Sequence, residues 1–273
     1  MNERPIIGIL AQETEGNFKE LGESFIYSTY VKFAESSGAQ VVPIKICQTE
    51  EYYKEIFHRI NGLIMPGGVV SIQNSKYTEA AKILINLAIQ ANDKNDYFPI
   101  FGICLGFQVL LQYFSSDNIM DRCSNSNVKS GLRLEQGYEE SKLFGSLDKN
   151  MKEIFETEDV LINFHYDCIT PKDFFANKLD ASFRILSRNY DINKFEFISC
   201  YEARSYPFYG VQFHPEKNPF FWVLNEKVSN IPHTKNAIKA SQYFSNFFVN
   251  EARKSYHKFE DLETEKKALD LQL

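Results

Sequence analysis

Two short segments of the chain combine residue types that carry out nucleophilic catalysis. In the first, Cys104 follows the apolar run Ile100–Ile103 and precedes a second apolar run, 109–114, with Gly102 and Gly106 on either side. This pattern is typical of a nucleophile elbow, a strained turn from strand to helix that leaves no room for neighbouring β-carbons. The helix N-terminus would favour the thiolate form of the cysteine. The simpler interpretation is a small apolar residue at the end of a buried strand.

The second segment, Tyr-Gly-Val-Gln-Phe-His-Pro-Glu, contains His214 and ends at Glu216. A cysteine nucleophile needs a general base within hydrogen-bonding distance, and the base needs a third group that holds its tautomer. Residues two apart on a strand project to the same side, so both side chains could face Cys104 if the two strands are close. A histidine beside a strand is by itself more often structural. Its combination with the elbow favours a catalytic role.

A pair of glycines, Gly67 and Gly68, follows a third apolar run at 63–65. Acyl transfer requires N–H groups that converge on a developing oxyanion, and we assign this role to the N–H groups of Gly68 and Leu105. Pro-Gly-Gly is also a common turn and is weak evidence alone. However, α/β proteins place their sites where the carboxyl ends of parallel strands meet. Here the ends of three strands would carry the nucleophile, the general base and the oxyanion donors.

The pattern of the chain predicts the elements that must position these residues. Short apolar runs alternate with longer amphipathic stretches, which is typical of a parallel α/β sheet. Strands are expected at Ile6–Leu10, 41–44, 63–65, Ile100–Ile103, 160–164, 196–201 and 208–213, and helices at 27–37, 50–60, 77–90 and 235–257. A charged tail, 260–273, is expected to fray or to pack loosely. One domain over residues 1–273 is the simplest interpretation.

Composition excludes several classes of protein. The 273 residues carry a net charge of −6 with acidic and basic residues interleaved, which argues against a nucleic-acid partner. No apolar run approaches the ~20 residues that span a bilayer. The five cysteines are scattered and include no CxxC pair, so they predict neither a zinc site nor a dense disulfide framework. The first residues show no secretion signal, and no N-x-S/T sequon occurs.

In their order, Pro-Gly-Gly, Gly-x-Cys-x-Gly and His-Pro-Glu resemble the class I glutamine amidotransferase superfamily, whose catalytic triad is Cys, His and Glu. Over about residues 4–260 the chain is similar to the γ-glutamyl hydrolases, most specifically in His-Pro-Glu-Lys-Asn-Pro and Phe-Val-Asn-Glu-Ala-Arg-Lys. The resemblance implies a flavodoxin-like three-layer sandwich with a mostly parallel central sheet. It also implies cleavage of γ-glutamyl amide bonds in folylpoly-γ-glutamates through a thioester on Cys104, without a metal or organic cofactor. A homodimer and a lysosomal, vacuolar or secreted location are implied by the resemblance alone.

The resemblance adds residues that would contact the substrate. Tyr30 and His165 match residues that line the substrate cleft, although His165 could instead be a core histidine, and Gly67 and Gln108 would lie in the same cleft. Two departures stand out. Gln108 occupies a position where the hydrolases usually have Glu and the amidotransferases Gln, and the segment 69–74 lacks the usual charged residues. Both changes remove charge near the predicted cleft and put the fine substrate preference in question.

Three alternative functions remain open at this stage. The first is a glutaminase subunit that passes ammonia to a synthetase, although the chain after the last expected helix is too short to supply one. The second is a hydrolase acting on other γ-glutamyl amines. The third is a non-catalytic relative that keeps the fold as a binding or storage protein. The intact set of Cys104, His214, Glu216 and Gly68 argues against the third alternative.

Overall fold

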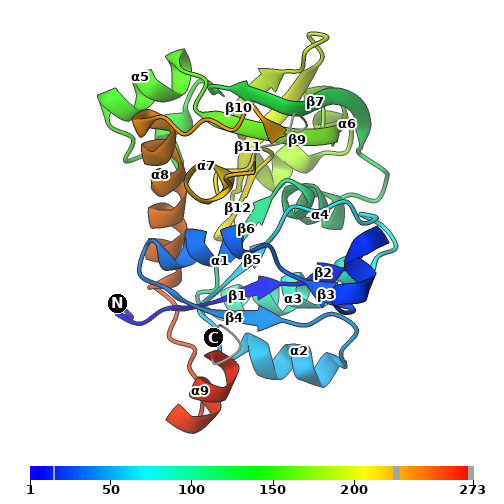
Figure 1. Ribbon diagram of the computed structural model, residues 1–273, viewed down its shortest axis with the longest axis vertical. Helices are drawn as coiled ribbons and strands as arrows, with labels where there is room; N and C mark the ends of the chain where they lie inside the picture. The colour runs from blue at the N-terminus through cyan, green and yellow to red at the C-terminus, as the bar shows by residue number, and fades with distance from the viewer. Residues whose placement is uncertain (15, 224–227, 270–273) are drawn as a thin grey trace.

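A central sheet of eight strands organises the computed structural model, which describes residues 1–14, 16–223 and 228–269. The strand order is β4-β1-β5-β6-β12-β11-β10-β8 (Figure 1). The first five strands are parallel: β4 (Gln40–Ile44), β1 (Ile6–Leu10), β5 (Gly62–Met65), β6 (Ile100–Ile103) and β12 (Phe208–Val211). The other three extend the sheet in antiparallel fashion: β11 (Glu196–Ala203), β10 (Phe183–Tyr190) and β8 (Arg133–Leu134).

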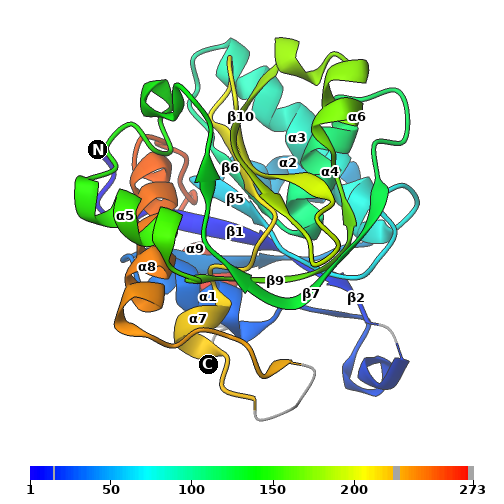
Figure 2. The same cartoon turned by 90° about the horizontal axis from the view of Figure 1, so that it is seen from above.

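Helices cover both faces of this sheet (Figure 2). One face packs against α1 (Ser28–Glu35), α5 (Lys149–Thr157), α7 (Lys217–Phe220) and α8 (Lys235–Ala252). The opposite face packs against α2 (Glu50–Phe57), α3 (Lys76–Asp93), α4 (Leu105–Tyr113) and α6 (Pro171–Ala176). The predicted three-layer α/β fold is therefore confirmed. In the part of the chain that the structure describes, no helix is both long and apolar enough to cross a membrane.

The continuous apolar sequence of β1 follows from this layering. Ile6 and Leu10 belong to the core under α2, α3 and α4, whereas Ile7 and Ile9 belong to the core under α1 and α8. Successive side chains of a strand point to opposite faces. A strand that is apolar at every position therefore needs cover on both faces, and parallel strands in α/β proteins have it.

Side-chain caps fix where several helices begin. Thr49 accepts a hydrogen bond from the N–H of Tyr52 at the start of α2, and Ser75 accepts one from Thr78 at the start of α3. Thr234 caps α8 in the same way. Such caps satisfy N–H groups that have no partner within the helix. They explain why the predicted helices begin within a residue or two of the observed ones.

A second, smaller sheet was not expected from the sequence. This sheet pairs β7 (Asp121–Ser130) with β9 (Leu161–Cys168), and a disulfide between Cys123 and Cys168 joins the two strands. The expectation of no dense disulfide framework still allows one bond, but its partners lie 45 residues apart and only the fold brings them together. The remaining short elements are β2 (Gln12–Glu13), β3 (Ser24–Phe25) and the 3₁₀ helices Gly16–Leu21, Tyr138–Glu140 and Leu179–Ala181.

Part of the charged tail forms a short helix on the surface. Residues Leu262–Leu269 form α9, which lies beside β4 at the edge of the sheet (Figure 1). Asp261 accepts hydrogen bonds from the N–H groups that begin this helix, and Glu265 pairs with Arg4 at 2.8 Å. A local cap and a long-range ion pair thus order these residues, and no side chain of α9 is buried, in keeping with the expected alternative of a tail that packs loosely on the surface. Residues 270–273 lie outside the described residues.

The buried side chain of Asn61 ties distant parts of the fold together. Its Oδ1 accepts a hydrogen bond from the N–H of Ile6 at 2.8 Å, at the start of β1. Its Nδ2 donates to the carbonyls of Ser255 at 3.2 Å and His257 at 2.8 Å, after the end of α8. One amide therefore joins β1, the residue before β5 and the segment after α8.

Replacing Asn61 by Ala should lower the free energy of unfolding by about 3 kcal/mol, because it leaves buried backbone groups without partners. Urea denaturation of the variant and the unmodified protein measures this difference. Asn150→Ala, at an exposed position on α5, is the matched control and should change it by less than about 0.5 kcal/mol. Equal effects of the two substitutions would contradict the role of Asn61.

Candidate active site

Three neighbouring strand ends meet at one point of the sheet. The strands β5, β6 and β12 lie side by side and parallel, with β6 in the middle. The segments that follow them carry Gly67 and Gly68, then Cys104, then His214. The structure thus brings together the residues that the sequence assigned to the oxyanion site, the nucleophile and the base. Their elements run in the direction that places all of them at the carboxyl edge.

Cys104 sits in a strained turn between β6 and α4. Its φ of 52° and ψ of −102° lie outside the regions that non-glycine residues ordinarily adopt. The turn is also tightly packed, since a Cβ on Gly106 would lie 2.0 Å from the carbonyl oxygen of Met65. A Cβ on Gly102 would lie 2.7 Å from the carbonyl oxygen of Gly106. Both flanking glycines are therefore required by close backbone contacts.

His214 and Glu216 form a buried pair beside this turn. The Nδ1 of His214 lies 2.9 Å from Oε1 of Glu216, whose side chain is fully buried. The expectation that strand alternation aligns them is wrong, because β12 ends at Val211 and Glu216 lies at the first turn of α7. The N–H of His214 donates to the carbonyl of Ile162 on β9 at 2.8 Å, which fixes the turn.

Opposing influences set the charges of this pair. Burial lowers the pKa of His214, but the carboxylate of Glu216 and the Cys104 thiol beside it raise this pKa by more, to about 9. Burial raises the pKa of Glu216, but the neighbouring His214 lowers it by more, so that its pKa falls below the ordinary value. At neutral pH the two groups therefore form an ion pair. A proton on His214 would also stabilise a thiolate at Cys104.

The loop after β5 presents a free N–H group near the cysteine. Among the residues that the structure describes, neither the N–H of Gly68 nor that of Leu105 has a hydrogen-bond acceptor. The loop itself is held firmly. The N–H of Gly67 donates to the hydroxyl of Tyr30 at 2.8 Å, and Nε2 of Gln12 donates to the carbonyl of Gly67 at 2.9 Å. The two unpaired donors are thus available to a ligand in a fixed position.

A cavity of about 230 Å³ opens in front of Cys104 and His214. Tyr30 lines it, and its hydroxyl lies 3.4 Å from Nδ1 of His214. Burial raises the pKa of Tyr30 well above its ordinary value, so its hydroxyl stays neutral. Four further aromatic side chains line it: Phe25, Tyr27, Phe164 and Phe221.

Lys217 is the one lysine or arginine among the described residues that line this cavity. Its Nζ lies 3.8 Å from Oε1 of Glu216 and between 4.6 and 5.6 Å from the ring centres of Tyr27, Phe164 and Phe221. The sequence prediction did not include this residue. The sequence signal that could have identified Lys217 is its position directly after His-Pro-Glu. Because α7 begins at this residue, its side chain lies at the same cavity as His214.

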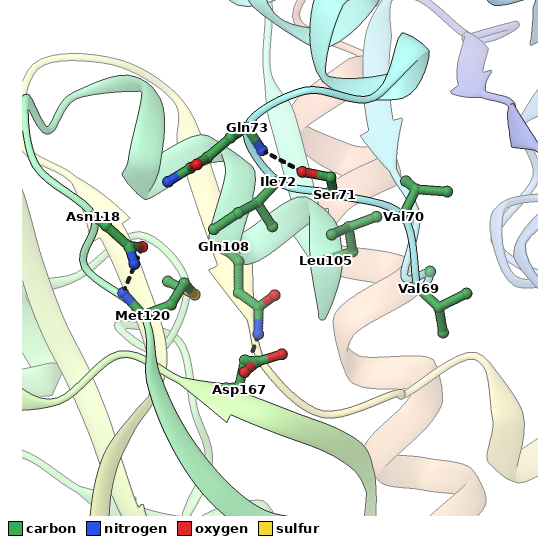
Figure 3. Close-up of a pocket in the computed structure, with 11 residues that line it drawn as sticks. Val69, Val70, Ser71, Ile72, Gln73, Leu105, Gln108, Asn118, Met120 and Asp167 are labelled. Atoms are coloured by element: carbon green, nitrogen blue, oxygen red, sulfur yellow. Dashed lines mark hydrogen bonds between the residues drawn. The ribbon is translucent and has the colours of Figure 1, made fainter.

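A second cavity, of about 380 Å³, lies on the other side of the Gly68 loop and contains Gln108 (Figure 3). Its polar lining includes Ser71, Gln73, Gln108, Asn118 and Asp167. Nε2 of Gln108 donates to the carbonyl of Asp167 at 2.9 Å and to Oε1 of Gln212 at 3.2 Å. A glutamate at 108 would face the carbonyl oxygen of Asp167 without a proton to donate, and the amide of Gln212 would have to turn its Nε2 towards it. The local hydrogen bonds therefore explain why position 108 carries Gln here instead of the Glu that is usual in the γ-glutamyl hydrolases.

The structure does not place His165 in either cavity. It is buried against the disulfide, with Nδ1 at 3.5 Å from Sγ of Cys123 and 3.3 Å from Sγ of Cys168. The ring of Phe197 covers it at 5.1 Å. Burial lowers the pKa of His165 to about 3, so the ring is neutral. Its surroundings favour the core-histidine alternative over a direct contact with substrate.

Known proteins resemble this chain in sequence over nearly its whole length. Residues 5–216 match the family model described as Peptidase C26. The chain is 41% identical to γ-glutamyl hydrolase from Rattus norvegicus, covering 95% of this chain and 81% of the relative. The identity is 40% to γ-glutamyl hydrolase from Homo sapiens, with 97% and 83% covered. It is 37% to γ-glutamyl hydrolase B from Dictyostelium discoideum, with 98% and 78% covered.

Solved structures share the fold. A glutamine amidotransferase from Methylobacillus flagellatus superimposes with a TM-score of 0.51 at 14% identity, covering 96% of this chain and 98% of that one. A glutamine amidotransferase from Thermotoga maritima gives 0.50 at 12% identity, with 92% and 99% covered. The fold and the family match define a cysteine-type peptidase with a class I glutamine amidotransferase-like fold. Within that class, the chain belongs to the Peptidase C26 family, which its γ-glutamyl hydrolase relatives represent.

Replacing Glu216 by Gln should lower the pKa of His214 from about 9 to near or below about 6.5, because burial then outweighs the remaining favourable charge. NMR titration of the histidine ring signals measures this change. Glu202→Gln, at another buried carboxylate that accepts hydrogen bonds from the N–H groups of Lys142 and Leu143, is the matched control. A pKa of His214 that is the same in both variants would refute the coupling.

Proposed function

We propose that the protein hydrolyses γ-glutamyl amide bonds of folylpoly-γ-glutamates through a thioester on Cys104. The observation that carries the proposal is the buried pair of His214 and Glu216 beside a strained cysteine at adjacent strand ends. The γ-glutamyl hydrolases among its relatives supply the chemical class of the substrate. The chemistry needs no metal or organic cofactor, because the protein groups supply the nucleophile, the base and the oxyanion donors.

In the first step, the sulfur of Cys104, whose proton His214 has already taken up, attacks the γ-carbonyl carbon of the substrate. The oxyanion that forms is stabilised by the N–H groups of Gly68 and Leu105, which have no other acceptor among the described residues. His214 then gives its proton to the leaving nitrogen as the C–N bond breaks. Glu216 holds Nδ1 of the ring through these transfers, so that the opposite nitrogen, Nε2, handles the proton.

In the second step, a water molecule replaces the departed amine. His214 takes a proton from this water, which attacks the thioester carbon, and the same two N–H groups stabilise the second oxyanion. Cleavage of the C–S bond then restores the Cys104 thiolate beside the protonated His214. The products are a shortened γ-glutamyl chain with a free γ-carboxyl group and a glutamate-containing amine.

The two cavities suggest where each half of the substrate lies. Because His214 must reach the leaving nitrogen, the leaving amine should occupy the cavity that His214 and Lys217 line. The acyl half should then occupy the cavity that contains Gln108, on the other side of Gly68. Gly67 and Tyr30 hold the loop that separates them. The Lys217 ammonium group would pair with a carboxylate of the leaving glutamate.

Replacing Lys217 by Met keeps the length of the side chain but removes its charge. We expect KM for folylpentaglutamate to rise about tenfold, with a smaller fall in kcat, since one charge-assisted contact with the leaving group is lost. Steady-state kinetics measures both values. Lys239→Met, at an exposed position on α8, is the matched control and should leave both unchanged. A normal KM in the Lys217 variant would exclude this contact.

Replacing Cys104 by Ala should abolish turnover while the fold is retained, because the strained site is not needed for stability. The release of glutamate from folylpentaglutamate measures turnover, and thermal unfolding checks the fold. Cys47→Ser, at an exposed free cysteine, is the matched control and should retain full activity. Substantial activity in the Cys104 variant would rule out the thioester mechanism.

The same assay separates the alternatives. Cleavage of free glutamine in preference to folylpentaglutamate would favour a glutaminase, and preferential cleavage of other γ-glutamyl amines would favour a broader hydrolase. A binding protein without activity would cleave none of them. Labelling of Cys104 by a thiol-directed electrophile, blocked by a γ-glutamyl ligand, would argue for an enzyme whose substrate had not been supplied. The products formed from folylpentaglutamate would show whether terminal or internal bonds are cut.

A lysosomal, vacuolar or secreted location belongs to the same proposal. Disulfides persist in oxidising compartments, and the bond between Cys123 and Cys168 supports such a location. A homodimer is also part of the proposal, and it rests on the family resemblance alone. Neither a nucleic-acid partner nor attachment to a membrane is included, in keeping with the net charge of −6.

A further inference from the structure

The disulfide lies at an irregular point of the β7–β9 pair. Arg122 pairs with Asp167, but the next pair is Asn125 with His165, so Cys123 and Ser124 form a bulge. The two sulfur-bearing residues differ in access. Cys123 is 8% exposed and lines an open cavity of about 430 Å³, whereas Cys168 is completely buried. Among the described residues, the Cys123 side therefore offers a reagent in solution the more open approach to the bond.

The cavity at Cys123 is a formed feature rather than a loose surface hollow. The carboxylate of Asp191 accepts hydrogen bonds from the N–H groups of Ser124 at 2.7 Å, Asn193 at 2.8 Å and Phe195 at 2.8 Å. These bonds hold the loop after β10 against the bulge of β7. The negative charge of Asp191 is satisfied by them and is buried.

The charged groups left available at this cavity are positive. Arg122 and Lys194 line it together with the exposed ring of Tyr166 and the ring of Phe195. Arg122 pairs with Asp167 at 2.9 Å through one guanidinium nitrogen, and its side chain remains mostly exposed. Two cations at the cavity that Cys123 lines favour an anionic partner.

On its buried side, the disulfide has a histidine ring nitrogen beside both sulfurs. Nδ1 of His165 lies 3.3 Å from Sγ of Cys168 and 3.5 Å from Sγ of Cys123. Burial keeps this ring neutral by lowering its pKa to about 3. A neutral imidazole can accept a hydrogen bond from a thiol or donate one to it, depending on its tautomer. Either sulfur, once released, would therefore have a polar partner inside the protein.

We propose that the Cys123–Cys168 disulfide is a thiol–disulfide exchange site for small anionic thiols. A thiolate held between Arg122 and Lys194 attacks Sγ of Cys123, a new S–S bond forms there, and the bond to Cys168 breaks. Cys168 leaves as a thiolate and takes a proton from water. A second thiol molecule then attacks the sulfur of the first thiol molecule, and the bond from that sulfur to Sγ of Cys123 breaks. Both cysteines are then reduced, and the two thiol molecules leave joined as a disulfide.

Opening this bond acts on the substrate cavity through β9. The carbonyl of Asp167, next to Cys168, accepts the hydrogen bond from Gln108, whereas Ile162, which holds His214, lies six residues away. Exchange thus frees the end of β9 that lines the Gln108 cavity and leaves the end beside His214 in place. It should therefore weaken substrate binding more than it slows the chemical step. This coupling rests on the proposed function, but the exchange itself does not.

The exchange is tested in the Cys47→Ser protein, which lacks the exposed free cysteine. Its reaction with 2-mercaptoethanesulfonate is compared with that of neutral 2-mercaptoethanol, at equal thiolate concentration, by intact mass and peptide mapping. We expect an adduct on Cys123 that forms about fivefold faster with the sulfonate. Substituting both Arg122→Gln and Lys194→Gln should remove this advantage without stopping the neutral thiol. Equal rates for the two thiols, or an adduct on Cys168, would overturn the proposal.

The coupling is tested by kinetics on the same protein before and after reduction. We expect KM for folylpentaglutamate to rise about threefold or more on reduction, with kcat changed by less than about twofold. The double substitution Cys123→Ser and Cys168→Ser should give the same KM as the reduced protein. An unchanged KM in the reduced protein would overturn the coupling. An absence of all γ-glutamyl hydrolysis would instead count against the proposed function and leave the mass result valid.

Discussion

The hydrogen bond between His214 and Glu216 is the interaction on which the rest of the site depends. A carboxylate that is fully buried is costly unless a charged or hydrogen-bonding partner compensates for lost water. The turn that holds this pair is fixed from outside, because Nδ2 of Asn218 donates to the carbonyls of Val160 at 2.7 Å and Ala237 at 3.0 Å. The short helix α7 is thus anchored to β9 and α8. Cys104 can then be strained and still face a base of fixed orientation.

Much of the fold and of the site could be predicted from local sequence. The strand Ile100–Ile103 was placed at its observed bounds, because a buried parallel strand is apolar at every position and ends here in a glycine turn. The nucleophile elbow could be read for the same reason, since Gly102 and Gly106 report close backbone contacts that any side chain would prevent. The starts of helices could be predicted from capping residues such as Ser75, which precedes α3. Each of these signals lies within a few residues of the feature that it predicts.

The remaining features depend on partners far away in the chain. The polar sequence of β7 has no strand-like alternation, and it pairs with β9 only because the main sheet brings the two together. The same holds for the disulfide of Cys123 and for the covering of His165, which no local pattern reveals. Lys217 faces the cavity because α7 turns back at that point. The order of α9 depends on the ion pair of Glu265 with Arg4.

The amide pair of Gln108 and Gln212 has a consequence for how this protein can evolve. The two residues are 104 positions apart, yet the donor on one meets the acceptor on the other at 3.2 Å. Substitutions at these positions are therefore not independent: an acid at 108 would require the amide of Gln212 to turn its Nε2 donor, instead of its Oε1, towards position 108. Gln212 can make this adjustment only while it keeps its amide, so the residue at 108 is inherited together with a partner near the other end of the chain.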